Sequence, residues 1–226
     1  MHSPTLPVLY SLQHCPYAMR ARMAVIKADI QVELRAIKLS NKPTEMLDAS
    51  PKGTVPVLVL PQRLKEQPMV IEESLDIMLW ALAQNDPHRL LPLKQHLPEM
   101  IDRIVRFESE FVPALDSYKQ AKRYHEDSLI ETRLRCESIL APLESRLKDS
   151  PFLCGEREQL LDIALVTLIR KFTRVERAWF RQSQYVGIQR WLNHYIQSPL
   201  FSLTMRHVEL WLPKKQAVMF GAKKPT

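Results

Sequence analysis

The stretch PVLYSLQHCPYAMRARMAVIK, residues 7–27, joins a short apolar run, a polar turn and a helical pattern in immediate succession. Its first four residues, 7–10, predict a buried strand. The chain then reaches Cys15 and Pro16, and proline is favoured in the first turn of a helix. We therefore predict a strand that ends just before Cys15 and a helix that begins just after it.

The helix that follows has one apolar stripe. Met19, Met23 and Ile26 recur at i, i+4 and i+7, which is typical of a helix with one face in the core. The basic residues of this helix are expected to lie off that stripe, and they are Arg20, Arg22 and Lys27.

The rest of the first half alternates short elements of different type. Strands are predicted at 32–37, 57–60 and 69–71, a short helical or irregular stretch around 43–49, and a helix through Leu75, Met78, Leu79 and Leu82. The predicted order is strand, helix, strand, short helix, two strands and a helix, which indicates an α/β domain.

The second half is different, because its segments are long and carry helical periodicity from about residue 98 to residue 211. No strand is predicted there, and residues 221–226 are expected to form a frayed tail. We predict a first domain over 1–84, a linker over 85–97 and an all-helical domain over 98–226 that folds as a helical bundle.

Composition limits the classes of protein to consider. The 226 residues are 46% hydrophobic, enough for an ordinary core. The 32 basic and 25 acidic residues give a net charge of +7, but they are interleaved along the helices, so no nucleic-acid partner is expected. No window approaches the roughly 18 apolar residues of a membrane span, and no signal-peptide pattern is present. A soluble, cytoplasmic protein without membrane association is expected.

Glycines and cysteines exclude further chemistry. Only four glycines are present, which excludes the glycine-rich phosphate loops. Cys15, Cys136 and Cys154 match neither a zinc site nor a disulfide framework, so we expect no metal, no organic cofactor and a reducing compartment. Cys136 and Cys154 are interpreted as structural residues.

Cys15 is the candidate nucleophile. At the start of a helix, unpaired N–H groups and the helix dipole place partial positive charge beside the sulfur and favour the thiolate. A thiolate is the nucleophile of disulfide exchange, so this arrangement can perform that chemistry without a cofactor. The alternative interpretation is a small buried hydrophobic residue, which is what free cysteines usually are.

Four motifs in order favour the first interpretation. They are YSLQHCPYA at 10–18, NKP at 41–43, GTVPVL at 53–58 and EES at 72–74. Together they resemble the glutathione-binding half of the cytosolic glutathione transferase superfamily, with the closest match to the cysteine-type members of the omega class and, in the Cys-Pro-Tyr element, to glutaredoxins. The resemblance implies a thioredoxin-like domain followed by a helical domain.

The resemblance also implies roles for individual residues. Val55-Pro56 matches the cis-proline loop, whose backbone would pair with the cysteine portion of glutathione. Glu73-Ser74 matches the pair that holds the γ-glutamyl end, with the serine on the α-carboxylate and the glutamate on the ammonium. Lys42 matches the lysine that meets the glycyl carboxylate, and Lys52 is its alternative.

Other positions leave alternatives open or depart from the family. Ser11 or Tyr10 would instead activate glutathione by a hydroxyl hydrogen bond and drive its conjugation to electrophiles. Ala18 stands where a second cysteine would complete a Cys-x-x-Cys pair, so a cycle through a single thiol remains. In the second half Asp162 matches the start of a central helix, but Gln159 replaces the usual Ser or Thr and is a poor N-cap.

The sequence therefore predicts a glutathione-dependent transferase of the cysteine type, acting as a thiol transferase through a mixed disulfide between Cys15 and glutathione. Its partners are expected to be glutathione, used as a substrate, a small electrophile or disulfide as second substrate, and a second copy of the chain in a homodimer. The alternatives are a non-catalytic interaction or regulatory protein of the same fold, and conjugation of glutathione by Ser11 or Tyr10.

Overall fold

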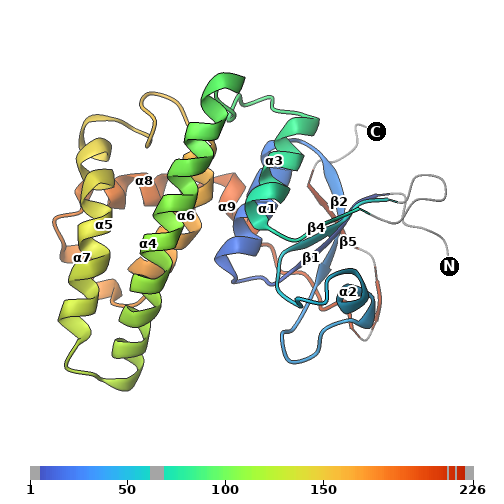
Figure 1. Ribbon diagram of the computed structural model, residues 1–226, viewed down its shortest axis with the longest axis horizontal. Helices are drawn as coiled ribbons and strands as arrows, with labels where there is room; N and C mark the ends of the chain where they lie inside the picture. Colours follow the sequence, from blue (N-terminus) through green and yellow to red (C-terminus); the bar gives the residue numbers. More distant parts are fainter. Residues whose placement is uncertain (1–5, 62–68, 213, 217, 222–226) are drawn as a thin grey trace. The chain divides into compact units, whose positions relative to one another are not determined.

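A computed structural model describes residues 6–61, 69–212, 214–216 and 218–221. The chain divides into two compact units (Figure 1), which we call the sheet unit, residues 1–88 and 199–226, and the helical unit, residues 89–198. Each is described by itself. The fold class is the predicted one, a thioredoxin-like sheet with helices followed along the chain by a helical bundle.

The sheet unit is built on five strands in the order β4-β3-β1-β2-β5. The strands are β1 (Val8–Ser11), β2 (Gln31–Ala36), β3 (Val57–Val59), β4 (Val70–Ile71) and β5 (Val218–Gly221). Only β1 and β2 pair in parallel, with Val8 opposite Glu33, and the other three pairings are antiparallel. Residues 62–68, which separate the predicted strands at 57–60 and 69–71, lie outside the described residues.

Helices lie on both faces of this sheet. They are α1 (Pro16–Lys27), α2 (Thr44–Ala49), α3 (Ser74–Gln84) and α9 (Pro199–Thr204). The first of them, α1, packs against both α3 and α9, and Figure 1 shows α1 and α3 on the side of the sheet away from α2. Because side chains alternate along a strand, β1 sends Leu9 and Ser11 toward one face and Val8 and Tyr10 toward the other.

The face toward α2 has its own apolar cluster. Its buried members are Val8, Tyr10, Ile37, Met46 and Val57, and the partly buried Val55, Val59 and Val70 pack against it. Met46 belongs to α2, so this short helix is held by burial of one side chain under the sheet. The cluster fixes the ends of β1 and β3, where the predicted site residues lie.

The helical unit contains one 3₁₀ turn and five helices among its described residues. They are η1 (Lys94–His96), α4 (Leu97–Tyr124), α5 (Leu129–Asp149), α6 (Leu160–Thr173), α7 (Arg177–Gln182) and α8 (Val186–Ile196). Helix α4 packs against α5 and α6, and α8 packs against the same two helices. The buried Glu144 of α5 accepts hydrogen bonds from the first N–H groups of α8, at Gly187 and Ile188, which ties the two helices together.

The start of α6 is closed by a capping box, in which the side chains of Gln159 and Asp162 each accept a hydrogen bond from the other residue's backbone N–H. Gln159 occupies the N-cap position, and its N–H donates to Asp162 Oδ2 at 3.0 Å. The other carboxylate oxygen, Oδ1, accepts from Leu153 N–H and from the Trp191 indole N–H, both at 2.9 Å. Asp162 is fully buried, so one carboxylate organises the helix start and its surroundings.

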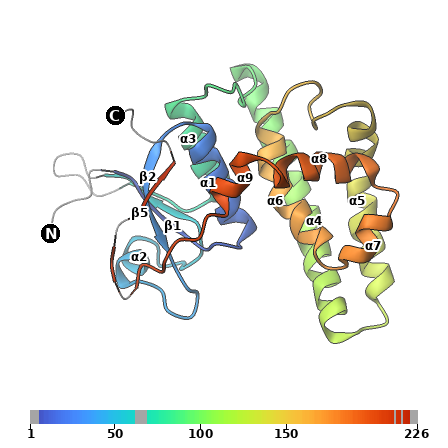
Figure 2. The same cartoon turned by 180° about the vertical axis from the view of Figure 1, so that it is seen from behind.

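The last part of the chain departs from the sequence-based prediction. Residues 199–226 belong to the sheet unit, although the sequence places them in the helical domain. Val218–Gly221 forms a strand beside β2, seen from behind in Figure 2, although no strand is predicted in this half and the predicted frayed tail begins at Gly221. Residues 222–226 lie outside the described part. A strand of four residues is too short to show a clear alternation of apolar and polar residues, and its pairing with β2 depends on residues far away in the sequence.

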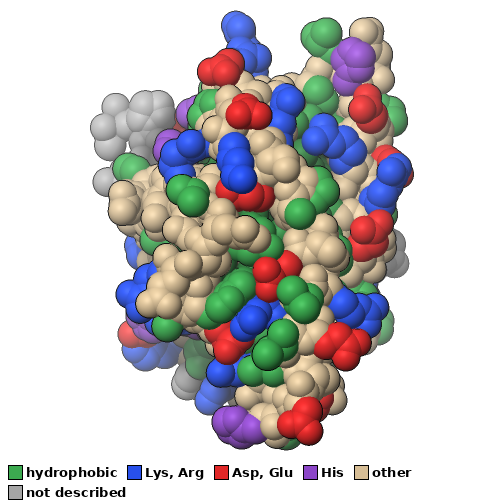
Figure 3. Space-filling view, turned by 90° about the vertical axis from the view of Figure 1, so that its left-hand side faces the viewer, with side chains coloured by type: hydrophobic (Ala, Val, Ile, Leu, Met, Phe, Trp, Pro, Cys, Tyr) green, Lys and Arg blue, Asp and Glu red, His purple; other side chains and the backbone are tan. Residues whose placement is uncertain are grey.

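Charges on the surface are mixed in sign. On the face shown in Figure 3, acidic and basic side chains are interspersed with hydrophobic ones. Helix α4 also carries charges of both signs, in the ion pairs Arg106–Asp102 and Lys119–Asp116. Among the described residues, no helix is both long enough and apolar enough to cross a membrane.

Asp162 gives a prediction about pH. Burial raises the pKa of Asp162 to about 6, and this outweighs its three N–H donors, which favour the carboxylate. From about pH 4 to pH 6 the folded chain therefore holds a proton that the unfolded chain has lost, so this contribution to the free energy of unfolding falls as pH rises. Substitution Asp162→Asn removes the titration.

We expect the difference in free energy of unfolding, wild type minus Asp162→Asn, to decrease by about 3 kcal/mol across that pH range, measured by urea denaturation. The exposed Asp149 supplies the matched control, because Asp149→Asn should leave the difference nearly constant. A constant difference for Asp162→Asn as well would contradict the prediction.

Candidate active site

Cys15 lies at the junction of β1 and α1. It is the residue immediately before the helix, its φ and ψ of −72° and 123° are extended, and Pro16 takes the first helical position. Its N–H donates to Leu12 O at 3.2 Å and its C=O accepts from Met19 N–H at 2.8 Å. The side chain is partly exposed at the positive end of the helix dipole.

Val55 faces this cysteine from the loop before β3. Cys15 Sγ lies 3.8 Å from Val55 O, and the Val55–Pro56 peptide bond is cis, as the sequence predicts. The Val55 side chain packs against the cluster under α2, which anchors the loop. Within the described residues the Val55 N–H and C=O make no backbone hydrogen bonds, so both are available to an extended peptide.

Ser74 begins α3 and is bonded to α1. Its hydroxyl oxygen accepts from Arg20 Nε at 3.0 Å and from Arg20 Nη2 at 2.8 Å. Both residues are buried, with 4% and 2% of their surface exposed. Because the oxygen accepts from the guanidinium, the hydroxyl proton is directed elsewhere and can be donated to an anion.

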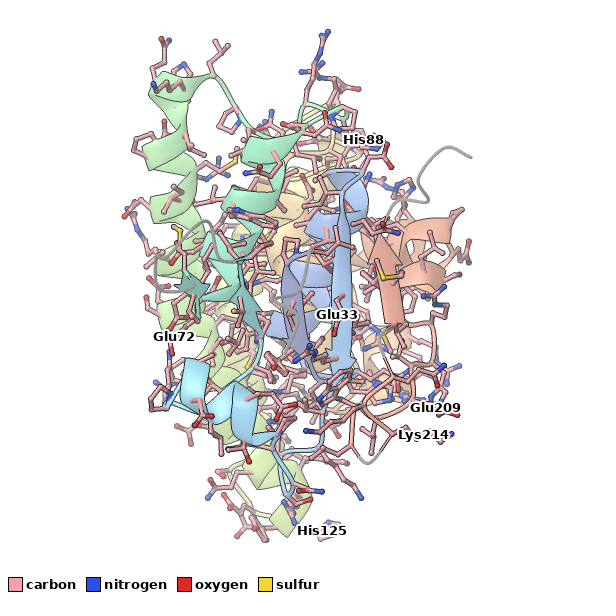
Figure 4. All side chains as sticks on the ribbon, turned by 90° about the vertical axis from the view of Figure 1, so that its right-hand side faces the viewer. Glu33, Glu72, His88, His125, Glu209 and Lys214 are labelled. Carbon is pink, nitrogen blue, oxygen red and sulfur yellow. The ribbon has the colours of Figure 1, made fainter. Side chains whose placement is uncertain are left out.

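Glu73 and Lys52 form an exposed ion pair between the start of α3 and the loop after α2. The neighbouring Glu72, labelled in Figure 4, accepts a hydrogen bond from Ser50 Oγ at the end of α2. Two adjacent carboxylates thus tie the end of β4 to α2. Of the two lysines considered, Lys52 is the one that the structure pairs with Glu73.

Lys42 lies over Gly53. A Cβ built on this glycine would come within 3.1 Å of Lys42 Nζ, and the backbone there has φ of +64°, so glycine suits the position for two reasons. In the part of the chain that the structure describes, Lys42 makes no ion pair. Its charge is therefore available, whereas that of Lys52 is neutralised by Glu73.

The two hydroxyls that offered alternative chemistry are both buried and engaged. Ser11 is only 1% exposed, and its Oγ accepts a hydrogen bond from Arg22 Nη1 at 2.6 Å. Tyr10 OH accepts from Arg35 Nη1 at 2.8 Å, and burial raises the pKa of Tyr10. Arg35 is itself held by Glu33 and stacks on the Trp211 ring at 4.0 Å. Neither hydroxyl has the partial exposure of the Cys15 thiol.

The arginines of α1 are where the prediction from helical periodicity is wrong. Arg20 and Arg22 are expected off the apolar stripe, yet both are buried. Each has polar partners inside the unit, Arg20 at Ser74 and Arg22 at the β1–α1 loop. The signal that could have found them is their place within seven residues of Cys15, because an amphipathic pattern alone assigns every arginine to solvent.

The residues predicted to bind glutathione all belong to the sheet unit, and several of them are linked by contacts. Cys15 contacts Val55, and Ser74 is tied to the helix that Cys15 begins. Glu73 precedes Ser74, and Lys42 lies beside the loop before Pro56. Across the described residues, no group of three or more His, Cys, Asp or Glu side chains is placed to hold a metal ion.

The other two cysteines belong to the helical unit. Cys136 is fully buried and burial raises its pKa to about 12. Burial also raises the pKa of Cys154, which lies in the turn before α6. Both environments disfavour a thiolate, in agreement with structural roles.

A sheet of this order, with a cysteine at the start of the first helix and a cis-proline peptide against it, defines the thioredoxin-like class of domain. The sequence matches the glutathione S-transferase N-terminal domain over residues 9–90 and the glutathione S-transferase C-terminal domain over residues 130–194. The two matches cover well over half of the chain, and the chain belongs to the glutathione S-transferase family.

Relatives from plants and mammals have low identity to the chain. The rice protein IN2-1 homolog A (Oryza sativa subsp. japonica) is 30% identical over 166 residues, which are 72% of this chain and 64% of the relative. Glutathione S-transferase DHAR2 of Arabidopsis thaliana is 28% identical, over 68% and 65% of the two chains. Mouse glutathione S-transferase omega-1 is 24% identical, over 88% and 75%. The chain spans about two thirds of the length of the two plant relatives.

Solved structures share the fold. A glutathione transferase from Pseudomonas putida, described with one glutathione disulfide bound per subunit, aligns with a TM-score of 0.77 at 17% identity. The alignment covers 91% of this chain and 93% of the other. At this identity the likeness establishes the architecture of the chain.

The three cysteines are expected to differ in reactivity. Iodoacetamide at pH 7.5 should alkylate Cys15 at least about ten times faster than Cys136 or Cys154, because Cys15 is partly exposed at a helix start and burial disfavours the other thiolates. Peptide mass spectrometry of the digested protein gives the three rates. Equal rates, or faster alkylation of Cys136, would contradict this assignment.

Proposed function

We propose that the chain is a glutathione-dependent thiol transferase of the cysteine type, which removes glutathione from mixed disulfides. The observation that carries the proposal is the Cys15 thiol, partly exposed at the start of α1 and 3.8 Å from the Val55 carbonyl oxygen. The hydroxyls of Ser11 and Tyr10, which would serve conjugation, are buried and bonded to arginines.

The reaction has two exchange steps. The Cys15 thiolate attacks the glutathione sulfur of a mixed disulfide, the Cys15–glutathione disulfide forms, and the substrate leaves as a thiolate that takes up a proton. A second glutathione, as thiolate, then attacks the glutathione sulfur held on Cys15. Glutathione disulfide leaves, and the Cys15 thiolate is regenerated with no net oxidation of the protein.

A single-thiol cycle fits the surroundings of Cys15. Ala18, one turn into α1, is fully buried and occupies the place of the second cysteine of a dithiol pair. The resolving thiol therefore comes from solution, which favours glutathione itself and a small or flexible disulfide as the other substrate.

The α-carboxylate of the γ-glutamyl group would bind at the start of α3. Ser74 can donate its hydroxyl proton there because its oxygen accepts from Arg20, and the buried guanidinium adds positive charge behind it. The Val55 N–H and C=O would pair with the cysteine portion of the peptide, next to the Cys15 sulfur.

Lys42 is better suited than Lys52 to the glycyl carboxylate. Lys52 already pairs with Glu73, whereas Lys42 makes no ion pair with the described residues. The γ-glutamyl ammonium can take the place of Lys52 at the exposed Glu73 carboxylate, because exposed ion pairs contribute little and exchange readily.

The relatives support this class of activity. Two of them are named glutathione S-transferases, DHAR2 and omega-1, and the Pseudomonas putida structure is described with glutathione disulfide bound. The proposal extends to a cytoplasmic location, where a free thiol is kept reduced, and to a homodimer.

Substitution Cys15→Ser should abolish turnover of a glutathionylated peptide, because a serine hydroxyl does not form or release a mixed disulfide at neutral pH. Glutathione binding, measured by calorimetry, should survive. In the wild type, incubation with glutathione disulfide should add about 305 Da to the Cys15 peptide, the mass of one glutathionyl group. Cys154→Ser is the matched control and should retain both the activity and the adduct.

The outcomes separate the alternatives. Activity retained by Cys15→Ser would shift the assignment to conjugation through Ser11 or Tyr10. Failure of the wild type to bind glutathione, together with no adduct, would favour a non-catalytic interaction protein.

Substitution Ser74→Ala should weaken glutathione binding by about tenfold or more, because it removes one hydrogen bond to a carboxylate. Measuring Kd in a Cys15→Ser background excludes covalent capture. Ser138→Ala, at an exposed hydroxyl on α5, is the control and should leave Kd unchanged. An unchanged Kd for Ser74→Ala would remove Ser74 from the proposed site.

A further inference from the structure

Arg22 is a buried cation that reaches from α1 into the loop before Cys15. Its Nη2 donates to Gln13 O at 2.6 Å, and its Nη1 donates to Ser11 Oγ at 2.6 Å and to Leu12 O at 3.3 Å. Leu12 O also accepts the N–H of Cys15. The guanidinium therefore bonds to the last residue of β1 and to the two residues that follow it, which lead to the turn at Cys15.

The direction of this side chain follows from the helix. Cys15 and Arg22 are seven residues apart, close to two turns, so they lie on the same side of α1. Helical side chains point toward the N-terminus of their helix, and an arginine is long enough to cover the intervening turn. Arg22 is only 3% exposed, so water does not screen it as it screens a surface arginine.

The described partners of Arg22 are all neutral oxygens. A buried cation without an anion is costly, and folded proteins compensate such charges. Burial lowers the pKa of Arg22 to about 10, and the negative charge of ionised Cys15 acts in the opposite direction. Leu12 O accepts both from Arg22 Nη1 and from Cys15 N–H, so the guanidinium reaches the same carbonyl oxygen as the Cys15 backbone, and an ionised thiol there would supply a negative charge to offset it.

Other ionisable groups near the loop do not supply that anion. His14 lies in the loop itself, and Arg20 is committed to Ser74. On the elements packed against α1, Glu73 pairs with Lys52, Asp76 is exposed on α3, and Glu33 pairs with Arg35 on β2. The sequences of α9 and β5 contain no ionisable side chain.

We propose that Arg22 is the internal counter-ion of the Cys15 thiolate and fixes the loop that presents it, as a positioning residue for the thiol-transferase reaction. The role of Cys15 in turnover rests on the proposed function. The pairing of the two charges does not, because it is a property of the chain without glutathione.

The test is the pH dependence of Cys15 alkylation in the full chain. Iodoacetamide reacts with the thiolate, so the rate at the Cys15 peptide reports its ionisation at each pH. Arg22→Met keeps the length of the side chain without charge and should raise the midpoint of the profile by about one pH unit. Arg22→Lys keeps the charge, and its midpoint should stay within a few tenths of a unit of the wild type.

Controls separate charge from folding. Lys27→Met removes one positive charge from the same helix and should leave the midpoint unchanged. Circular dichroism and thermal unfolding show which variants are folded. If Arg22→Met does not fold, Arg22→Gln retains a donor for the loop carbonyls and should show the same upward shift.

An unshifted profile in a folded Arg22→Met or Arg22→Gln variant would overturn the proposal. A shift in Arg22→Lys as large as in Arg22→Met would also overturn it, because the loop geometry would then matter and the charge would not. A shifted alkylation profile in a protein that forms no glutathione adduct supports the counter-ion and rejects the proposed function. A glutathione adduct on Cys15 together with an unshifted alkylation profile would support the proposed function and reject the counter-ion.

Discussion

The hydrogen bonds that join α1 to the loop before it are the constraint on which the site depends. One rigid helix carries Cys15 at its first turn, Arg20 against the start of α3, and Arg22 against the loop. A displacement of α1 would therefore move the thiol, the serine and the loop together. Packing against α3 and α9 keeps the helix in place, since those contacts are among its main ones.

Buried and exposed charges have different tasks in this arrangement. The arginines are buried, so their bonds are weakly screened and hold the backbone and the Ser74 hydroxyl in position. The Lys52–Glu73 pair is on the surface, with about half of the lysine side chain exposed. Such a pair is weak, and in the proposed function a zwitterionic peptide ligand would exchange with it. The buried arginines thus hold the site residues in place, whereas the exposed Lys52–Glu73 pair leaves charges that a ligand could bind.

How far the sequence predicts this structure depends on how local each feature is. The strand before Cys15 and the helix after it are set by neighbouring residues, and both are found. The cis peptide at Val55–Pro56 follows from a motif. By contrast β5 pairs with β2 across most of the chain, and Gly221 fits there because a Cβ would clash with Ile30 O. No local pattern contains that information. The motif predicts Ser74 as a site residue. It does not predict the hydrogen bond to Arg20, which lies 54 residues away.

Stabilising the thiolate of Cys15 would serve both halves of the proposed cycle. In the first exchange Cys15 is the attacking group, and a larger thiolate fraction at neutral pH raises the rate, although nucleophilicity falls somewhat as the pKa falls. In the second exchange Cys15 is the leaving group, and a better stabilised thiolate leaves faster. A single-thiol enzyme has no second cysteine to drive that release. In the proposed cycle, the helix start and the buried cation at the same loop would therefore take over the task of the second cysteine, whose place Ala18 occupies.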